Sequence, residues 1–191
     1  MIVSILFLSI ILIILTGIPV GIGLGVVGLA FSIIFEGQSA LISLPQTIFS
    51  SNNSFLLTAI PMFILMSEIL RRANVTEILF DAVTKFVGHL PGGLAVSTVI
   101  TCAIGASITG SSVANAASMS IVAAPSMIKR GYDRKFTYGL IAASGTLGIL
   151  IPPSIPMLLY ASITEVSIGK LFISGIVPGL VLVTLLCAYV I

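Results

Sequence analysis

Oxygen-bearing side chains gather in the middle of two strongly apolar stretches of this 191-residue chain. The first group runs from Ser107 to Asn115 and reads SITGSSVAN. The second stretch, Gly145 to Met157, reads GTLGILIPPSIPM. Hard cations prefer oxygen ligands, and hydroxyl, amide and carbonyl oxygens are all available here. The two stretches are therefore candidate parts of a sodium site.

Three prolines prevent a continuous helix from running through the second stretch, at Pro152, Pro153 and Pro156. Proline lacks the N–H that a helix needs, and it pushes the residue before it toward extended geometry. We expect a helix to unwind near 145–148 and to restart near 154–156. Unwound backbone inside a membrane persists only where protein covers it or where it lines a polar cavity. Broken helices of this kind mark ion or substrate sites.

The residue types alone could bind two kinds of ion, an anionic group and sodium. Helices that start after Gly110 and after Pro153 would present free N–H groups and positive dipole ends, which suit an anionic group. The oxygens that suit sodium are the backbone carbonyls around 145–151, the hydroxyls of Thr109, Ser111, Ser112 and Thr146, and the Asn115 amide.

Each of these features also has a purely structural interpretation. A serine or threonine hydroxyl can bond to a carbonyl one turn back in its own helix. A proline can serve only as a kink, and small residues can serve only close helix packing. The joint occurrence of all three in two neighbouring apolar stretches favours the ion-site hypothesis.

No catalytic set is recognisable, so we expect a protein that is not an enzyme. The apolar segments contain no histidine pair, metal-spaced cysteines, HExxH motif or paired aspartates. Glu68 is the one acidic residue close to the interior of a segment. It is either an intramembrane proton or ion site or, as we favour, an interfacial ion pair with Arg71.

Composition indicates an integral membrane protein. Hydrophobic residues make up 58% of the chain and charged residues 7%, whereas soluble domains contain about 25% charged residues. The apolar runs are long and do not alternate, which favours helices over a β-barrel. Two basic groups are expected on the cytoplasmic side, and nothing in them indicates a nucleic-acid partner. They are Arg71, Arg72 and Lys85, and then Lys129, Arg130, Arg134 and Lys135.

The apolar runs and their interruptions predict an all-α, multi-span bundle. Residues 2–16 and 18–35 are expected to be two helices, or one long helix kinked at Pro19. A short interfacial helix is expected near 40–50, a span over 55–70, and an amphipathic surface helix over 75–89. Half-helices are expected at 135–149 and 155–163. A further span over 168–191 has no polar ending, so we expect the native chain to continue beyond Ile191.

Residues 94–128 predict a re-entrant hairpin. Both of its flanks carry residues typical of the cytoplasmic side, and its arms, Gly93–Ala106 and Val113–Ile128, fall short of the about 20 residues of a full span. The tip would be the TGSS turn at 109–112. The alternative is two ordinary spans joined by an outside loop.

Several strings together resemble one transporter family. They are TGSSVANAA at 109–117, MIKRGYDRKF at 127–136, AASGTLGILIPPSIPMLLYA at 142–161 and the N-terminal GIPVGIGLG. This combination is similar to the N-terminal half of the large permease subunit, of the DctM type, of tripartite ATP-independent periplasmic (TRAP) transporters. The family usually has serine where this chain has Thr109, which keeps the hydroxyl. Small or polar residues vary at the position of Asn115.

The resemblance implies the first inverted-repeat half of an elevator-type transporter in the bacterial inner membrane. Residues 1–90 would supply scaffold helices and a surface arm. Residues 91–164 would form half of the transport domain, with the re-entrant hairpin at 91–129 and the broken helix at 133–164, and 165–191 a further transmembrane helix. The implied partners are a small TRAP membrane subunit and a periplasmic solute-binding protein.

Carried across by motif, the hairpin tip and the broken segment would form a sodium site and one wall of a substrate site. Sodium would be the coupling ion and the only metal, with no other cofactor. The ion-binding candidates are Thr109, Gly110, Ser111, Ser112, Gly145, Thr146, Gly148 and Pro152. The substrate-binding candidates are Ser111, Ser112, Asn115, Pro153 and Ser154.

The function expected from these observations is sodium-coupled import of an organic acid. The resemblance implies a C4-dicarboxylate, a sialic acid or another sugar acid, without deciding among them. One alternative is a sodium–dicarboxylate type carrier that needs no binding protein. The other is a non-transporting membrane scaffold, in which the prolines only shape helices.

Overall fold

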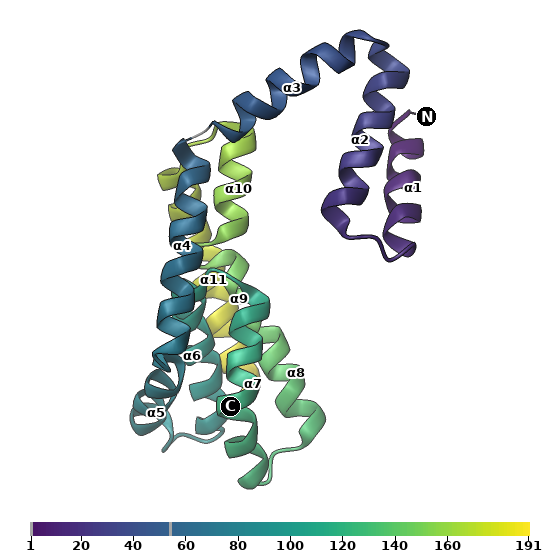
Figure 1. Ribbon diagram of the computed structural model, residues 1–191. Coiled ribbons are helices and arrows are strands. Elements are labelled where there is room, and N and C mark those ends of the chain that lie inside the picture. Colours follow the sequence, from purple (N-terminus) through teal and green to yellow (C-terminus); the bar gives the residue numbers. More distant parts are fainter. Residues whose placement is uncertain (1, 54) are drawn as a thin grey trace. The chain divides into compact units, whose positions relative to one another are not determined.

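The computed structural model describes residues 2–53 and 55–191, and all regular elements in these ranges are α-helices. This confirms the predicted all-α fold. The helices, drawn in Figure 1, are α1 (Ile2–Leu15), α2 (Val20–Glu36), α3 (Ser39–Asn52), α4 (Phe55–Arg72), α5 (Val75–Val87), α6 (Gly93–Thr109), α7 (Ser112–Lys129), α8 (Arg134–Gly145), α9 (Leu147–Leu150), α10 (Ile155–Thr164) and α11 (Ile168–Val190).

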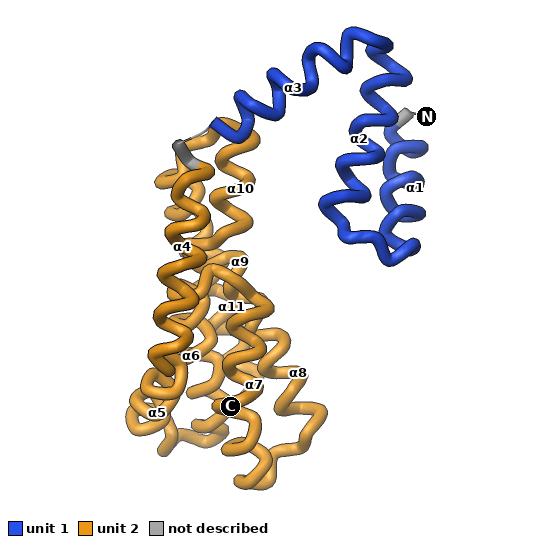
Figure 2. Tube along the Cα trace, in the orientation of Figure 1, with its two compact units in different colours: residues 1–53 blue, residues 54–191 orange. Residues whose placement is uncertain are grey.

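The chain forms two compact units, residues 1–53 and residues 54–191 (Figure 2). In the first unit, α1 and α2 pack against each other, and α2 also contacts α3. Gly17 has a φ of 77° in the turn between α1 and α2, and Gly23 lies so close to Ile13 that a side chain would overlap it. The prediction of two helices is therefore confirmed, and the single kinked helix is wrong.

The second unit is built around α6, which contacts α4, α5, α7, α8, α9 and α11. Twelve of its 17 residues are buried. Most are small, among them Ala95, Cys102, Gly105 and Ala106. Small side chains let neighbouring backbones approach closely, which is how helices associate where lipid removes the hydrophobic driving force. Because α6 contacts most of the other helices of this unit, it fixes their positions relative to one another.

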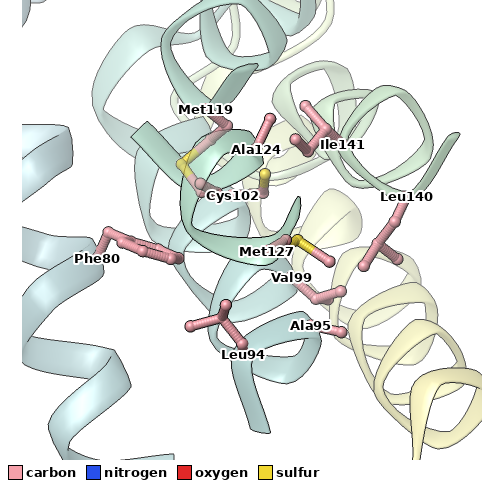
Figure 3. Close-up of a cluster of buried hydrophobic side chains, with 11 residues drawn as sticks. Phe80, Leu94, Ala95, Val99, Cys102, Met119, Ala124, Met127, Leu140 and Ile141 are labelled. Carbon is pink, nitrogen blue, oxygen red and sulfur yellow. The ribbon is translucent and has the colours of Figure 1, made fainter. Parts of the chain in front are cut away.

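One buried apolar cluster joins α6 to α5, α7 and α8 (Figure 3). Its largest fully buried members are Met119, Met127 and Ile141. In Figure 3, Met119 and Met127 point from α7 toward the small residues of α6, and Ile141 reaches the same cluster from α8. The cluster therefore fixes α8, which leads into the broken segment, against both arms of the hairpin.

Two stretches of the described residues are long and apolar enough to cross a membrane: Arg134–Thr164, with α8, α9 and α10, and Ile168–Val190, which is α11. Asp133 caps the start of the first, since its Oδ2 accepts a hydrogen bond from the Phe136 N–H at 3.1 Å. Helices α1, α2 and α6 are apolar but shorter. At about 1.5 Å per residue, the 17-residue α6 is about 25 Å long, less than the bilayer core of about 30 Å.

The buried cluster makes a direct test of the fold possible. Met119 is 0% exposed, and its replacement by alanine leaves a cavity among packed helices. We expect Met119→Ala to reduce the free energy of unfolding by about 2–5 kcal/mol, seen as a lower thermal midpoint of the purified complete permease.

The control is Ile121→Ala in the same helix, because Ile121 is 77% exposed. Its effect should stay within about 0.5 kcal/mol. Equal losses from the two substitutions would contradict the position of Met119 in the core.

Candidate functional site

The hairpin of α6 and α7 turns within two residues. Helix α6 ends at Thr109 and α7 begins at Ser112, so only Gly110 and Ser111 lie outside helices. Gly110 has a φ of 58°, in the left-handed region that favours glycine. Ser111 is extended and caps α7, because its Oγ accepts a hydrogen bond from the Ala114 N–H at 3.4 Å. The turn is therefore shorter than the four-residue TGSS tip that the sequence predicts.

The break in the second stretch begins later than predicted. Thr146 separates α8 from α9 but keeps helical backbone angles, α9 continues to Leu150, and only 151–154 is non-helical before α10 begins. The expected unwinding at 145–148 is therefore wrong, whereas the half-helices expected at 135–149 and 155–163 are confirmed. Glycine only weakens a helix, whereas proline excludes it. Ile151, the residue before Pro152, is extended with a ψ of 120°, as the steric effect of a following proline requires.

The same prolines remove hydrogen-bond partners from backbone carbonyls. In a helix, each carbonyl accepts from the N–H four residues later. Pro152, Pro153 and Pro156 have no N–H to offer. The carbonyls of Gly148, Ile149 and Pro152 therefore lack their usual helical partner. Such carbonyls can bind a cation without a charged side chain having to be buried in the membrane.

The structure brings the hairpin tip onto the broken segment. The Ile155 N–H, in the first turn of α10, donates to the Gly110 carbonyl at 3.3 Å. A Cβ on Gly110 would lie 2.9 Å from the Pro153 carbonyl oxygen. A bulkier residue at position 110 would therefore separate the two backbones.

A second contact between the tip and the broken segment lies at Gly148 in α9. A Cβ on Gly148 would lie 2.8 Å from the Ser112 nitrogen and 2.9 Å from the Ser111 carbonyl carbon. The Ser112 Oγ donates to the Thr146 carbonyl at 3.4 Å. Figure 1 shows the turn between α6 and α7 beside α9, with which both helices are in contact. The predicted meeting of the two elements is thus a direct backbone contact.

Two of the candidate hydroxyls bond to a backbone carbonyl about one turn earlier in the chain. Thr109 Oγ1 donates to the Gly105 carbonyl at 3.0 Å, and Thr146 Oγ1 donates to the Ala143 carbonyl at 2.6 Å. Each oxygen is a donor in these bonds, so its lone pairs remain available to a cation. The structural interpretation and the ligand interpretation are therefore compatible at both positions.

Ser154 is the exception among the candidate hydroxyls. Its side chain is 0% exposed, and its Oγ has no hydrogen-bond partner. It lies at the start of α10 in a narrow recess that it shares with Thr109, Gly110 and Pro153. Buried polar groups are almost always paired. Buried hydroxyls without a partner also occur at Thr84 and Thr101, so Ser154 differs from them by its place beside the hairpin tip.

Asn115 occupies a different place from the other candidates. It is 1% exposed, and its Nδ2 donates to the Cys102 carbonyl at 2.8 Å across the hairpin. A Cβ on Gly105 would lie 2.7 Å from its Oδ1. Asn115 therefore holds α7 against α6 below the tip.

Gly145 and Glu68 have structural explanations. A Cβ on Gly145 would lie 2.7 Å from the Ala116 Cβ, so this glycine permits close packing of α8 on α7. Glu68 accepts two hydrogen bonds from Arg71, at 2.8 and 2.7 Å, and one from Arg72 at 2.8 Å. The ion-pair interpretation of Glu68 is confirmed.

Three contributors to this region are not among the predicted residues: Gly105, Cys102 and the backbone of Ile155. A signal for the first was present, because Gly105 and Asn115 both lie five residues from Gly110. Residues at equal distances from a tight turn face each other in a hairpin, so a glycine opposite an asparagine predicts a close contact. In the described residues, no three His, Cys, Asp or Glu side chains lie together as a metal cluster.

The hydrogen bond across the hairpin gives a second test. We expect Asn115→Ala to lower the free energy of unfolding by about 0.5–1.5 kcal/mol, because it removes a buried hydrogen bond between α7 and α6. Thermal unfolding of the complete permease measures the loss.

Ser107→Ala is the matched control, since the Ser107 Oγ donates to Ile104 within its own helix. It should change the midpoint much less than Asn115→Ala. If Asn115→Ala unfolded like the parent protein, the bond would contribute nothing to the hairpin.

Comparison with known families identifies the chain. The sequence profile described as "Tripartite ATP-independent periplasmic transporter, DctM component" matches residues 7–191. This range includes the hairpin and the broken segment, together with the helices that pack around them.

Individual relatives agree with the family match. The C4-dicarboxylate TRAP transporter large permease protein DctM of Vibrio cholerae is 38% identical over 94% of this chain. The protein of the same name from Pseudomonas aeruginosa is 41% identical over 80% of the chain. The ectoine TRAP transporter large permease protein TeaC of Halomonas elongata is 37% identical over 92%.

The chain spans only part of these relatives, since the matches cover 40%, 36% and 41% of their respective lengths. The relatives and the two long apolar stretches confirm the predicted location in a membrane, and the bacterial inner membrane is consistent with both. With a family match over nearly its whole length, the chain belongs to the DctM family of TRAP transporter large permease components.

Proposed function

We propose that the contact between the hairpin tip and the broken segment is half of a sodium-coupled transport site for an organic anion. The observation that supports this most directly is the approach of Gly110 to Ile155 and of Gly148 to Ser112. Two interrupted helices of one membrane protein expose carbonyls, hydroxyls and helix N-termini at one place. The prolines add carbonyls at 148, 149 and 152 that lack their usual helical donor and could serve as ligands.

Sodium would bind on the side of the contact formed by Thr109, Ser112, Thr146 and the carbonyls of 148–152. All of these ligands are neutral oxygens, which suits an ion that must enter and leave at every cycle. Gly110, Gly145 and Gly148 contribute by allowing the backbones to approach, and Pro152 by leaving the Gly148 carbonyl without a donor.

The substrate would lie at the N-terminal ends of α7 and α10. Ser111 caps one of these helices and Ser154 precedes the other, so Pro153 and both serines border the positive ends of the two dipoles. Relatives named for C4-dicarboxylate, isethionate and ectoine transport handle solutes that each carry a carboxylate or a sulfonate. We therefore assign this wall to the anionic group that such solutes share. Asn115 is left out, because its amide is already bonded to Cys102.

The rest of the proposal concerns the complete protein. The chain corresponds to about two fifths of the Vibrio cholerae relative, so the remaining part would supply the other wall of the site. In this proposal residues 1–90 supply scaffold and surface arm, 91–164 supply the transport half, and 165–191 a further span. A small membrane subunit and a periplasmic binding protein complete the transporter, which moves its transport half as an elevator and catalyses no reaction.

The experiment is uptake of labelled organic acids into proteoliposomes that contain the complete permease and both proposed partners. We expect accumulation with an inward sodium gradient and none with a choline gradient. Accumulation without the binding protein would replace the proposal by a stand-alone carrier. An absence of uptake of all tested acids by a folded complex would favour a scaffold.

Removing one proposed sodium ligand should change the sodium requirement. We expect Ser112→Ala to raise the sodium concentration for half-maximal uptake about tenfold or more, since a hydrogen-bonding or ligand oxygen facing a charge contributes about 1.5–3 kcal/mol. The control is Ser120→Ala, whose hydroxyl donates to Ala116 in its own helix. Identical sodium curves for Ser112→Ala and the parent would remove Ser112 from the site.

Pushing the backbone of α9 away from the hairpin tip should reduce uptake more than removing one hydroxyl does. We expect Gly148→Ala to lower uptake at least about tenfold, because a Cβ there meets the backbone of the tip at under 3 Å. Gly169→Ala is the control, since its Cβ would meet only Ser167 Oγ, at 3.9 Å. Normal uptake by Gly148→Ala would show that the close approach is not required.

A further inference from the structure

A groove between α8 and α11 lies outside the proposed transport site. Both helices pack on α6 but make little contact with each other, which leaves a space of about 320 Å³ between them. Figure 3 shows Leu140 on α8 pointing toward the yellow helix α11. The groove is lined by Lys135, Phe136, Gly139, Leu140, Ala143, Leu186 and Tyr189.

The polar groups of this groove gather at one end. Lys135 lies in the first turn of α8 and Tyr189 in the last turn of α11, while the lining between them and Ala143 is apolar. From Lys135 to Ala143 the helix rises about 12 Å. A groove with one charged end and an apolar remainder of that length has the shape of a binding site for a headgroup and the upper part of an acyl chain.

Gly139 supplies a second observation. A Cβ on this helical glycine would meet no described atom within 4 Å. Glycine in a helix costs about 1 kcal/mol relative to alanine, and close packing inside this part of the chain does not account for it. Its bare backbone instead widens the middle of the groove.

The basic residues around the polar end of the groove favour a negatively charged ligand. Lys129, Arg130, Arg134 and Lys135 lie within seven consecutive residues, and in the described part of the chain none of them forms an ion pair. Asp133 is the one acidic residue among them, and its carboxylate accepts a hydrogen bond from the Phe136 N–H. Such basic groups face the cytoplasm, where the leaflet carries anionic lipids.

We propose that the groove between α8 and α11 binds an anionic phospholipid, with the phosphate at Lys135 and Tyr189 and an acyl chain along Gly139 and Leu140. The lipid holds the start of α8 against α11. It is bound apart from the hairpin tip, so this site does not depend on the proposed transport function.

The test uses the complete purified permease in neutral detergent. Native mass spectrometry counts bound lipid as phosphatidylglycerol or phosphatidylcholine is added. We expect phosphatidylglycerol to bind at least about fivefold more tightly, the factor that one cation near an anionic headgroup contributes. Lys135→Gln should remove most of this preference.

Two further variants separate the groove from surface charge. Gly139→Leu fills the apolar part without changing charge, and it should lower phosphatidylglycerol binding about as much as Lys135→Gln. Lys170→Gln removes an exposed lysine from the first turn of α11, at the opposite end of that helix, and it should leave binding unchanged.

Three results would overturn the proposal. One is equal binding of the two lipids to the parent protein. Another is binding that neither Lys135→Gln nor Gly139→Leu alters, which would mean that the rest of the protein covers the groove. The third is equal losses from Lys135→Gln and Lys170→Gln, which would show attraction to net charge only.

Discussion

The structure of the second unit depends on three prolines that lack the backbone N–H groups a continuous helix would need. Pro152, Pro153 and Pro156 cannot supply the N–H groups that would close a helix around 148–156. Backbone polar groups without partners are tolerated at membrane depth only where protein covers them or where they line a polar cavity. The tip of the α6–α7 hairpin lies against this segment, and its Gly110 carbonyl accepts a hydrogen bond from the Ile155 N–H at 3.3 Å, which pairs a free N–H at the start of α10. The interruption and the hairpin are therefore one structural feature, and neither has an evident role without the other.

The remaining packing keeps these two elements in register. Helix α6 runs through the middle of the unit with small side chains, so α7 and α8 both approach it closely. Below the tip, Asn115 joins α7 to the Cys102 carbonyl of α6. The Ser144 Oγ donates to the Cys102 Sγ from α8 at 3.1 Å. Two polar bonds, from α7 and from α8, thus meet at Cys102 of α6.

Much of the fold could be predicted from the sequence, because the signals were local. Pro19, the basic pairs and the apolar run lengths gave the order of the helices and most of their ends. The break was displaced, since glycines at 145 and 148 look like helix breakers in a sequence but serve here as contact points for α7 and the tip. Whether a glycine weakens a helix or admits a neighbour depends here on residues far away in the sequence, Ala116 for Gly145 and Ser112 for Gly148. The contact of Asn115 with α6 could have been inferred, because Gly105 and Asn115 lie at equal distances from Gly110.

The measurement that tests the central claim most directly is the reactivity of a cysteine at position 111, in a complete permease without other cysteines. Ser111 lies at the tip, in the turn that meets the broken segment. Its rate of labelling by a small maleimide would be compared in sodium and in choline at equal ionic strength. The account predicts that sodium slows labelling in a concentration-dependent way, because ion binding closes the contact around residue 111. Equal rates in both salts at every concentration would contradict a sodium site at the hairpin tip.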